Sequence, residues 1–360
     1  MWNQAEIYRR RRRTFAAGVG LVLLLIIIIV AIGGGSPVKH LAANKTLPTS
    51  PAPLTYGGSA GLTEALRASF AAPIPGQNGF TLFGGLDVDK NATAVVETVS
   101  PTEAKPVGSL PVTLYGAAAV TLKSNEYIFG GSTGSLSSST GERGILSYNP
   151  TSSNSAITEI AKLPTNNTGA SAAVIGSTAY IVGGYDGSNT LNTIDSWTVG
   201  ETTAKVVAAQ LPVPLSYTAV AAVDGKLVIA GGLLADGVAS KAVYIFDPAS
   251  DRVRKLAAQL PSGLFAASGA TLGNFAYIIG GAVPNKTPTP TTLSTIYSVD
   301  PTSGQLARAG TMDISRGEAA SAVVDGKTIY LAGGLSDGAT TDSVGTLTLN
   351  ATATTTKKKH

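Results

Sequence analysis

Side chains able to do chemistry are scarce in this chain of 360 residues. The chain has no cysteine, and its two histidines, His40 and His360, lie far apart in the sequence. Thiolate chemistry, disulfide bonds and histidine-rich metal sites are therefore excluded, and we expect neither a cofactor nor a metal ion. Any acid–base chemistry or specific binding must come from carboxylates, arginines and tyrosines.

One segment begins like a calcium-binding loop. Asp87-Val-Asp89-Lys-Asn91 has oxygen ligands at alternate positions, as such loops do. However, Ala92 replaces the turn glycine, and Thr98 replaces the glutamate that would bind the ion through both oxygens. We interpret these residues as a solvated loop.

The charges are concentrated near the ends of the sequence. The formal net charge is +4, but Arg9–Arg13 and Lys357–Lys359 contribute much of the positive charge, and the sequence between them is slightly acidic. A nucleic-acid groove needs Lys and Arg clustered on the folded body. We therefore expect no nucleic-acid partner.

A hydrophobic segment follows the arginines. Residues Phe15–Ile32 carry no charge, and as a helix they would span about 27 Å, close to the thickness of a bilayer core. We predict a short basic cytoplasmic tail at residues 1–13 and a transmembrane signal-anchor helix at 14–35. The positive-inside rule then places the rest of the chain outside the cytoplasm, at the cell surface. A cleaved signal peptide is the alternative.

The remaining sequence contains an internal repeat of about 50 residues. Each of six units has a hydrophobic, β-prone run that ends in a glycine pair. The pairs are Gly84-Gly85, Gly130-Gly131, Gly183-Gly184, Gly231-Gly232, Gly280-Gly281 and Gly333-Gly334. Glycine permits backbone conformations and close contacts that a Cβ atom forbids, so we assign all twelve a structural role.

The sequence around each glycine pair predicts three further strands. A strand of small residues, such as Ala219–Val223, comes first and is joined to the glycine strand by a turn such as Asp224-Gly225. A third strand follows the pair, and a fourth runs into a Leu-Pro step such as Leu260-Pro261. Each repeat is thus predicted to be a four-stranded antiparallel meander.

In this pattern the chain resembles the kelch-repeat family, over roughly residues 40–350. The resemblance implies an all-β fold, a six-bladed kelch-type β-propeller spanning 36–350, with a polar basic tail at 351–360. It departs from the family in its aromatic residues, because only the third repeat has a tryptophan, Trp197, in the strand after the glycines.

The last repeat supplies only three strands before the sequence reaches its basic tail. Residues 38–48 are similar to 253–261, the predicted fourth strand of another repeat. We therefore predict that an N-terminal strand at about 41–47 completes the last blade and closes the ring.

Strand alternation predicts that the long connections all emerge on one face, which we call the loop face. Loops on a rigid scaffold commonly form binding sites, so this face is the candidate site. Tyr185, Asp186 and Asp337 follow glycine pairs, and the other candidates lie near the starts of inner strands, where the resemblance implies contact residues. These are Tyr115, Tyr217, Phe265, Arg316 and Glu318.

These expectations favour a membrane-anchored scaffold that binds a protein or a glycan. The alternative is an enzyme similar to the six-bladed kelch sugar mutarotases, which would need only acid–base groups such as Glu and Arg. Glu318 with Arg316, or Glu142 with Arg143, could fill that role. Without a catalytic motif, we assign no catalytic residue and favour binding.

Overall fold

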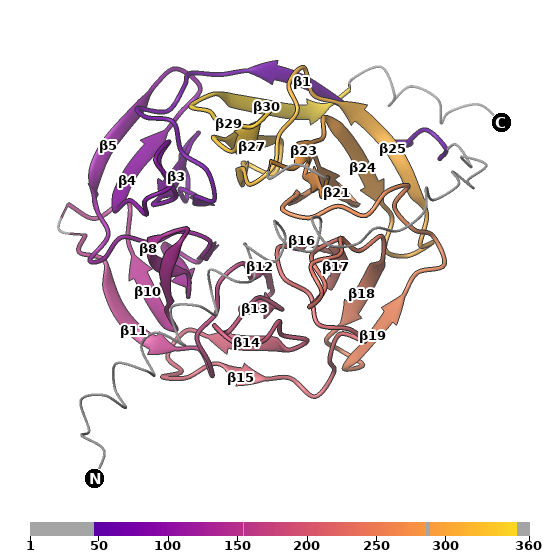
Figure 1. Cartoon of the computed structure of the whole chain (residues 1–360), viewed down its shortest axis with the longest axis horizontal. Coiled ribbons are helices and arrows are strands. Elements are labelled where there is room, and N and C mark those ends of the chain that lie inside the picture. Colours follow the sequence, from indigo (N-terminus) through magenta and orange to yellow (C-terminus); the bar gives the residue numbers. More distant parts are fainter. Residues whose placement is uncertain (1–46, 154, 286–288, 351–360) are drawn as a thin grey trace, which may run out of the picture.

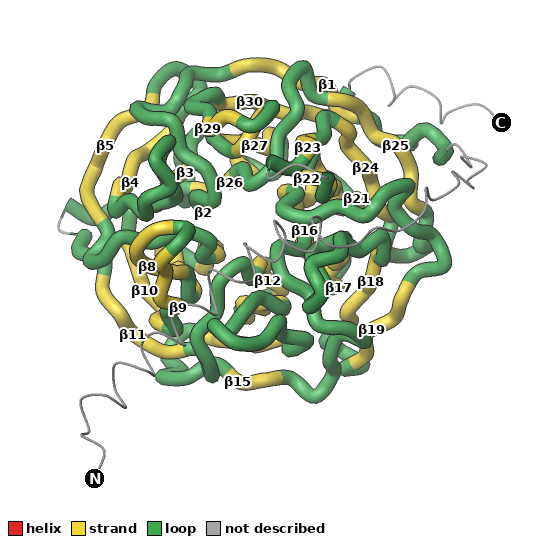
Figure 2. Tube along the Cα trace, in the orientation of Figure 1, coloured by secondary structure: helices red, strands yellow, loops and turns green. Residues whose placement is uncertain are grey.

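The computed structural model describes residues 47–153, 155–285 and 289–350. Six four-stranded antiparallel sheets surround a central axis (Figure 1), and these described residues form strands and loops (Figure 2). The predicted all-β, six-bladed propeller is confirmed. Among the described residues, no helix is long and apolar enough to cross a membrane. The predicted membrane-spanning segment lies outside them.

Each blade runs from an inner strand at the axis to an outer strand at the rim. The first three blades contain β2 (Phe70–Pro73), β3 (Phe80–Phe83), β4 (Val95–Val99) and β5 (Ala104–Ser109); β6 (Ala118–Leu122), β7 (Asn125–Phe129), β10 (Gly144–Tyr148) and β11 (Thr158–Lys162); and β12 (Ser171–Ile175), β13 (Thr178–Val182), β14 (Ile194–Thr198) and β15 (Lys205–Val206). The last three contain β16 (Ala219–Val223), β17 (Lys226–Ala230), β18 (Val243–Asp247) and β19 (Arg252–Lys255); β20 (Ser268–Leu272), β21 (Phe275–Ile279), β24 (Thr295–Val299) and β25 (Leu306–Thr311); and β26 (Ala320–Val324), β27 (Thr328–Ala332), β30 (Val344–Leu349) and β1 (Leu54–Gly58).

The long connections meet on one face, as predicted. In every blade, a residue just before the inner strand forms a β-bridge with the residue just after the glycine pair, as Tyr115 does with Ser132 and Thr168 with Tyr185. Three loops also contain small hairpins, formed by β8 (Ser132–Ser135) with β9 (Ser138–Gly141), β22 (Ala282–Val283) with β23 (Thr291–Thr292), and β28 (Leu335–Ser336) with β29 (Ala339–Thr340).

An N-terminal strand closes the ring, but it is not the predicted one. β1 pairs with β30 at the rim of blade 6, so residues 54–58 hold the position predicted for 41–47. The prediction that 41–47 form the closing strand is therefore wrong. The strand here needs alternate side chains facing the core, and Leu54 is buried whereas Thr55 is exposed. Of the predicted segment, only Leu47 is described, and it packs against the core near blades 4 and 5.

The chain before β1 ties blade 5 to blade 6. Ser50 N–H donates to the carbonyl of Arg308 on β25 at 2.7 Å, and Arg308 N–H donates to the carbonyl of Pro48 at 2.8 Å. The Tyr277 hydroxyl donates to the carbonyl of Ala52 at 2.8 Å. One segment thus spans both sides of the joint at which the ring closes.

The glycine pairs lock each blade to the next. Gly183 and Gly184 have φ values of +60° and +103°, which disfavour other residues. A Cβ atom on Gly183 would collide with the carbonyl oxygen of Leu215 in blade 4, and Gly184 N–H donates to that same oxygen at 2.9 Å. The other five pairs make the equivalent contacts, so the predicted structural role of these glycines follows from the interface between blades.

Aromatic side chains and three acids, Glu97, Glu126 and Asp195, are buried among the blades. Trp197 is fully buried against Tyr127, with ring centroids 4.9 Å apart. Glu126 on β7 is also fully buried, and the Thr81 hydroxyl of blade 1 donates to its Oε1 at 2.9 Å. Burial raises the pKa of Glu126 to about 8 and that of Asp195 to about 6, since a carboxylate loses its hydration there.

Candidate functional site

A closed ring of backbone hydrogen bonds surrounds the axis on the loop face. Each blade contributes one residue, placed two positions before its inner strand and having positive φ. The N–H of each residue donates to the carbonyl of its counterpart in the preceding blade, at 2.7–2.9 Å. The ring consists of Ala68, Gly116, Gly169, Tyr217, Ala266 and Glu318.

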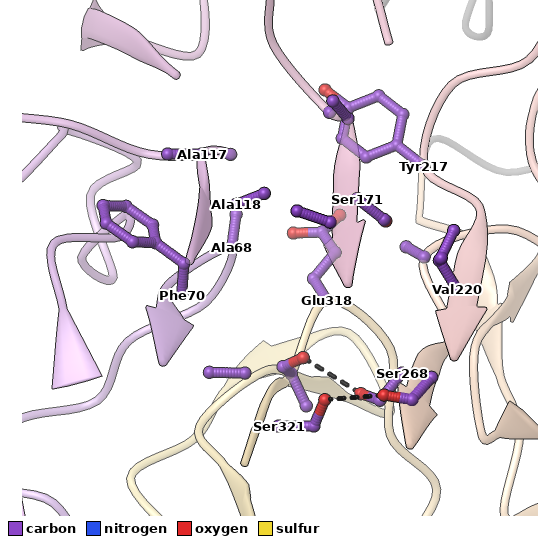
Figure 3. A pocket seen from close by; sticks show the side chains of 18 of the residues that line it. Ala68, Phe70, Ala117, Ala118, Ser171, Tyr217, Val220, Ser268, Glu318 and Ser321 are labelled. Carbon is purple, nitrogen blue, oxygen red and sulfur yellow. Dashed lines mark hydrogen bonds between the residues drawn. The ribbon is translucent and has the colours of Figure 1, made fainter. Parts of the chain in front are cut away.

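Two ring positions carry side chains larger than a methyl group. Tyr217 and Glu318 both have a φ of +54°, which costs a non-glycine residue about 1–2 kcal/mol. Such conformations persist where the surroundings impose them, and they are concentrated at functional sites. Figure 3 shows both side chains over the central opening. The ring therefore fixes one phenol and one carboxylate at the axis.

The opening leads into an axial channel of about 190 Å³. Alanine, glycine and serine from all six blades form most of its wall. Several wall hydroxyls bond across neighbouring blades, as when Ser268 Oγ donates to the carbonyl of Ala319 at 3.0 Å. Ionisable character comes from Tyr217 and Glu318, so chemical specificity lies at the loop-face end.

Arg67 pairs with Glu318. Its Nη1 lies 2.9 Å from Glu318 Oε2, and the side chains are 9% and 20% exposed. Sequence analysis missed Arg67, because the inner strand of the first repeat lacks the small-residue run of the other five. Alignment of Leu66-Arg67 with Leu114-Tyr115 and Leu264-Phe265 would have placed Arg67 one residue before the ring.

A second cavity, of about 40 Å³, lies beside the axis between blades 2, 3 and 4. Tyr115, Tyr185 and Tyr217 line it, together with Leu233 and Leu234. Burial is the main cause that raises the pKa of all three tyrosines, so their hydroxyls stay protonated at neutral pH. We call this cavity the tyrosine pocket.

Five of the eight predicted site residues are thus brought together. Tyr115, Tyr185 and Tyr217 line the pocket, and Glu318 lies close enough to influence both Tyr115 and Tyr217 electrostatically. Phe265 is buried in a small apolar cluster against which Tyr217 packs. Phe265 therefore packs with Leu233 and Tyr217, two of the residues that line the pocket.

Arg316 belongs instead to the interior of blade 6. It is 2% exposed, and its Nη1 donates to the carbonyls of Gly333 at 2.8 Å and Ser343 at 2.7 Å. It occupies the position held by leucine in four other blades, and by Asn167 in blade 3, whose amide likewise bonds to the first glycine of its pair. The prediction that Arg316 is a contact residue is therefore corrected, since its guanidinium donates hydrogen bonds to backbone carbonyls inside blade 6.

The predicted aspartates stabilise loops. Asp186 Oδ1 accepts hydrogen bonds from the N–H groups of Ser188 and Asn189, both at 2.7 Å. Asp337 is exposed, and its Oδ1 accepts from the Ser315 hydroxyl at 2.9 Å. Neither residue lines the tyrosine pocket or the channel.

The other acidic candidates are also separate from the axis. Asp87 Oδ1 accepts from Asn91 N–H at 2.8 Å, which closes the loop that resembles a calcium site. Within the described part of the chain, no three acidic or histidine side chains are grouped as metal ligands would be. Glu142 and Arg143 line neither cavity.

Comparison with known proteins gives three findings. Residues 71–281 match the family model described as the KLHDC2/KLHL20/DRC7 Kelch-repeats domain. The chain is 31% identical over 167 residues to "Kelch-like protein 35" of Mus musculus, an alignment covering 46% of this chain and 27% of that protein. A solved structure titled "Structure of YjhT" superposes with a TM-score of 0.66 at 15% identity, covering 79% of this chain and 95% of that one, a likeness of fold.

Proposed function

Because this chain belongs to the kelch-repeat β-propeller family, we propose that it binds a protein partner through its loop face, centred on the tyrosine pocket. The kelch propeller fold is suited to protein binding. The matched alignment covers about a quarter of the length of Kelch-like protein 35.

The convergence of three tyrosines from different blades carries this proposal. Tyr185 and Tyr217 are partly exposed and offer rigid aromatic surface with a hydroxyl donor at the end of each ring, while Tyr115, 3% exposed, forms part of the pocket wall. Tyrosine is enriched among the residues that dominate binding energy at protein interfaces. The three residues lie on a backbone held by bridges and ring hydrogen bonds, so partner binding requires little ordering of the propeller.

Cavity size favours a protein side chain over a small-molecule substrate. The pocket and the channel have volumes of about 40 and 190 Å³, below the roughly 300–1,000 Å³ of typical ligand sites. The mutarotase alternative is also weakened, since Arg316 is buried in blade 6 and Glu318 pairs with Arg67. Cavities this small at the loop face suit one or two side chains of a partner.

Replacement of the tyrosines should weaken binding strongly while preserving the fold. We expect Tyr185→Ala and Tyr217→Gly each to weaken binding of a peptide selected from a displayed library by at least about tenfold, because buried tyrosine anchors dominate such interfaces. Glycine at 217 retains the positive φ. Fluorescence anisotropy measures the affinity.

The matched control is Val206→Ala, which changes an exposed side chain on the rim of blade 3. It should leave both affinity and melting temperature unchanged. If the selected peptides bind the tyrosine variants as tightly as they bind the parent chain, the binding site lies elsewhere. If the protein accelerates the mutarotation of a sugar, as followed by NMR, and Glu318→Gln loses this activity, the mutarotase alternative is favoured.

We also propose that residues 15–32 anchor the propeller to a membrane, outside the cytoplasm. The support is the uncharged length of this segment and the arginines that precede it. Placing arginine at both Leu24 and Ile27 should move the protein from the membrane fraction to the soluble fraction of cells. In the parent chain, protease added to intact cells should digest the propeller, and full protection would contradict the proposed orientation.

A further inference from the structure

We propose that the partner segment recognised at the loop face is basic, and that Glu318 at the axis binds a lysine or arginine side chain of it. This inference rests on the proposed function and adds the chemistry of the partner. The observations that carry it are the charge of the loop face, the geometry of Glu318 and the aromatic surface beside it.

The exposed charges of the loop face are mostly acidic. Its connections carry Glu64, Asp89, Asp236, Asp313, Asp337 and Asp342, all exposed. The exposed basic residues described on these connections are Lys90, Arg143 and Lys241. A surface of one predominant sign attracts partners of opposite charge and repels those of like charge. The face therefore selects a cationic segment.

The opposite face has a different balance. Its turns carry exposed charges of both signs in similar number: the basic residues Lys123, Arg252 and Lys327, and the acidic residues Glu103, Asp224, Asp251 and Asp325. The excess of exposed acidic over basic residues is thus larger on the side of the ring that holds the tyrosine pocket. Charge and pocket together give a basic partner both attraction and an anchoring point.

Glu318 is placed to receive the cation. Arg67 contacts its Oε2, and within the described residues no hydrogen bond reaches Oε1. The side chain is 20% exposed, so a partner can approach from the loop face. A lysine or arginine could therefore pair with the second oxygen while Arg67 keeps the first, an arrangement that alternates positive and negative charge.

The tyrosine pocket would suit the rest of such a side chain. Aromatic ring faces attract ammonium and guanidinium groups by roughly 0.5–2 kcal/mol, and apolar walls accept the methylene stem. Tyr217 lines both the pocket and the channel, so it lies beside the position where the cation would meet Glu318. An acidic side chain would instead meet Glu318 and the aromatic faces unfavourably.

The test compares variants of the two members of one ion pair, Glu318 and Arg67, which carry opposite charges. Three short peptide pools, identical except for fixed lysine, glutamine or glutamate positions, serve as probes in anisotropy measurements. We expect the lysine pool to bind most tightly, and its affinity to fall as salt shortens the screening length from about 10 Å at 0.1 M to about 3 Å at 1 M. Glu318→Gln should weaken that binding about tenfold.

Arg67→Gln provides the matched control, because it leaves Glu318 without its cation and makes the axis more negative. We expect it to strengthen binding of the lysine pool, whereas damage to the fold would weaken binding in both variants. Tighter binding of the glutamate pool, equal binding of all pools, or no detectable binding of the lysine pool would overturn the inference. If the tyrosine variants still lose the displayed-library peptide, the proposed function stands without it.

Discussion

Leu54→Asp is expected to lower the free energy of unfolding by about 4 kcal/mol, or to prevent folding altogether. Leu54 is 6% exposed on β1 and lies in the apolar cluster that joins blades 5 and 6, with Ile296 and Leu347. A carboxylate there would lose its hydration without gaining a charged partner. The variant would also open the joint where the ring closes, and urea denaturation would measure the loss.

Thr55→Asp is the matched control, one residue further along the same strand. Thr55 is exposed, so the same new charge would remain in water and change stability by no more than about 0.5 kcal/mol. Equal denaturation midpoints for the two variants would mean that β1 does not close the ring as the structure has it.

Glu126 is expected to make the propeller lose stability as pH rises. Its ordinary pKa of 4.5 is raised to about 8 by burial, so between these values the unfolded chain releases a proton that the folded chain retains. Fewer protons on the unfolded state mean that the free energy of unfolding falls with increasing pH, by about 1.4 kcal/mol per unit for one proton. The contribution is complete below about pH 4.5 and is lost by about pH 8.

Glu126→Gln should remove the contribution of Glu126 to this slope, because glutamine fills the same space without ionising, whereas Asp195, whose pKa is raised to about 6, keeps its own contribution at lower pH. Its stability relative to the parent chain should therefore rise between pH 5 and 8 by several kcal/mol. Glu103→Gln, at an exposed position, should leave the slope unchanged. Denaturation curves at stepped pH would give the comparison, and parallel slopes for the parent chain and Glu126→Gln would show that the buried carboxyl does not titrate in this window.

The repeat pattern was sufficient to predict the ring. The glycine pairs recur because each interface between blades places a carbonyl oxygen where a Cβ would stand, so the same local requirement appears six times in the sequence. The loop face followed from strand alternation. The closing strand could not be predicted in the same way, since β1 lies far from the repeat it completes, and its glycine pair, Gly57-Gly58, falls outside the repeat of about 50 residues.

The candidate site was predicted only in part, because the repeat pattern marks some of its residues and not others. The tyrosines could be found because they lie at marked positions, either directly after a glycine pair or at the start of an inner strand. Arg316 was misread because charge suggests exposure, whereas its guanidinium fills a leucine position and bonds to backbone carbonyls. Neither the ring of hydrogen bonds nor the pairing of Arg67 with Glu318 can be seen in the sequence, as both join residues far apart in the chain.

The hydrogen-bonded ring also bears on how such a surface can evolve. Main-chain atoms alone make its six bonds, so mutation at these positions exchanges the side chain at the axis without removing a bond from the ring. Positive φ penalises every residue other than glycine, so selection can place large side chains at only a few blades before stability is exhausted. Duplicated repeats can thus diverge one blade at a time, and each substitution at the axis alters specificity on an inherited scaffold.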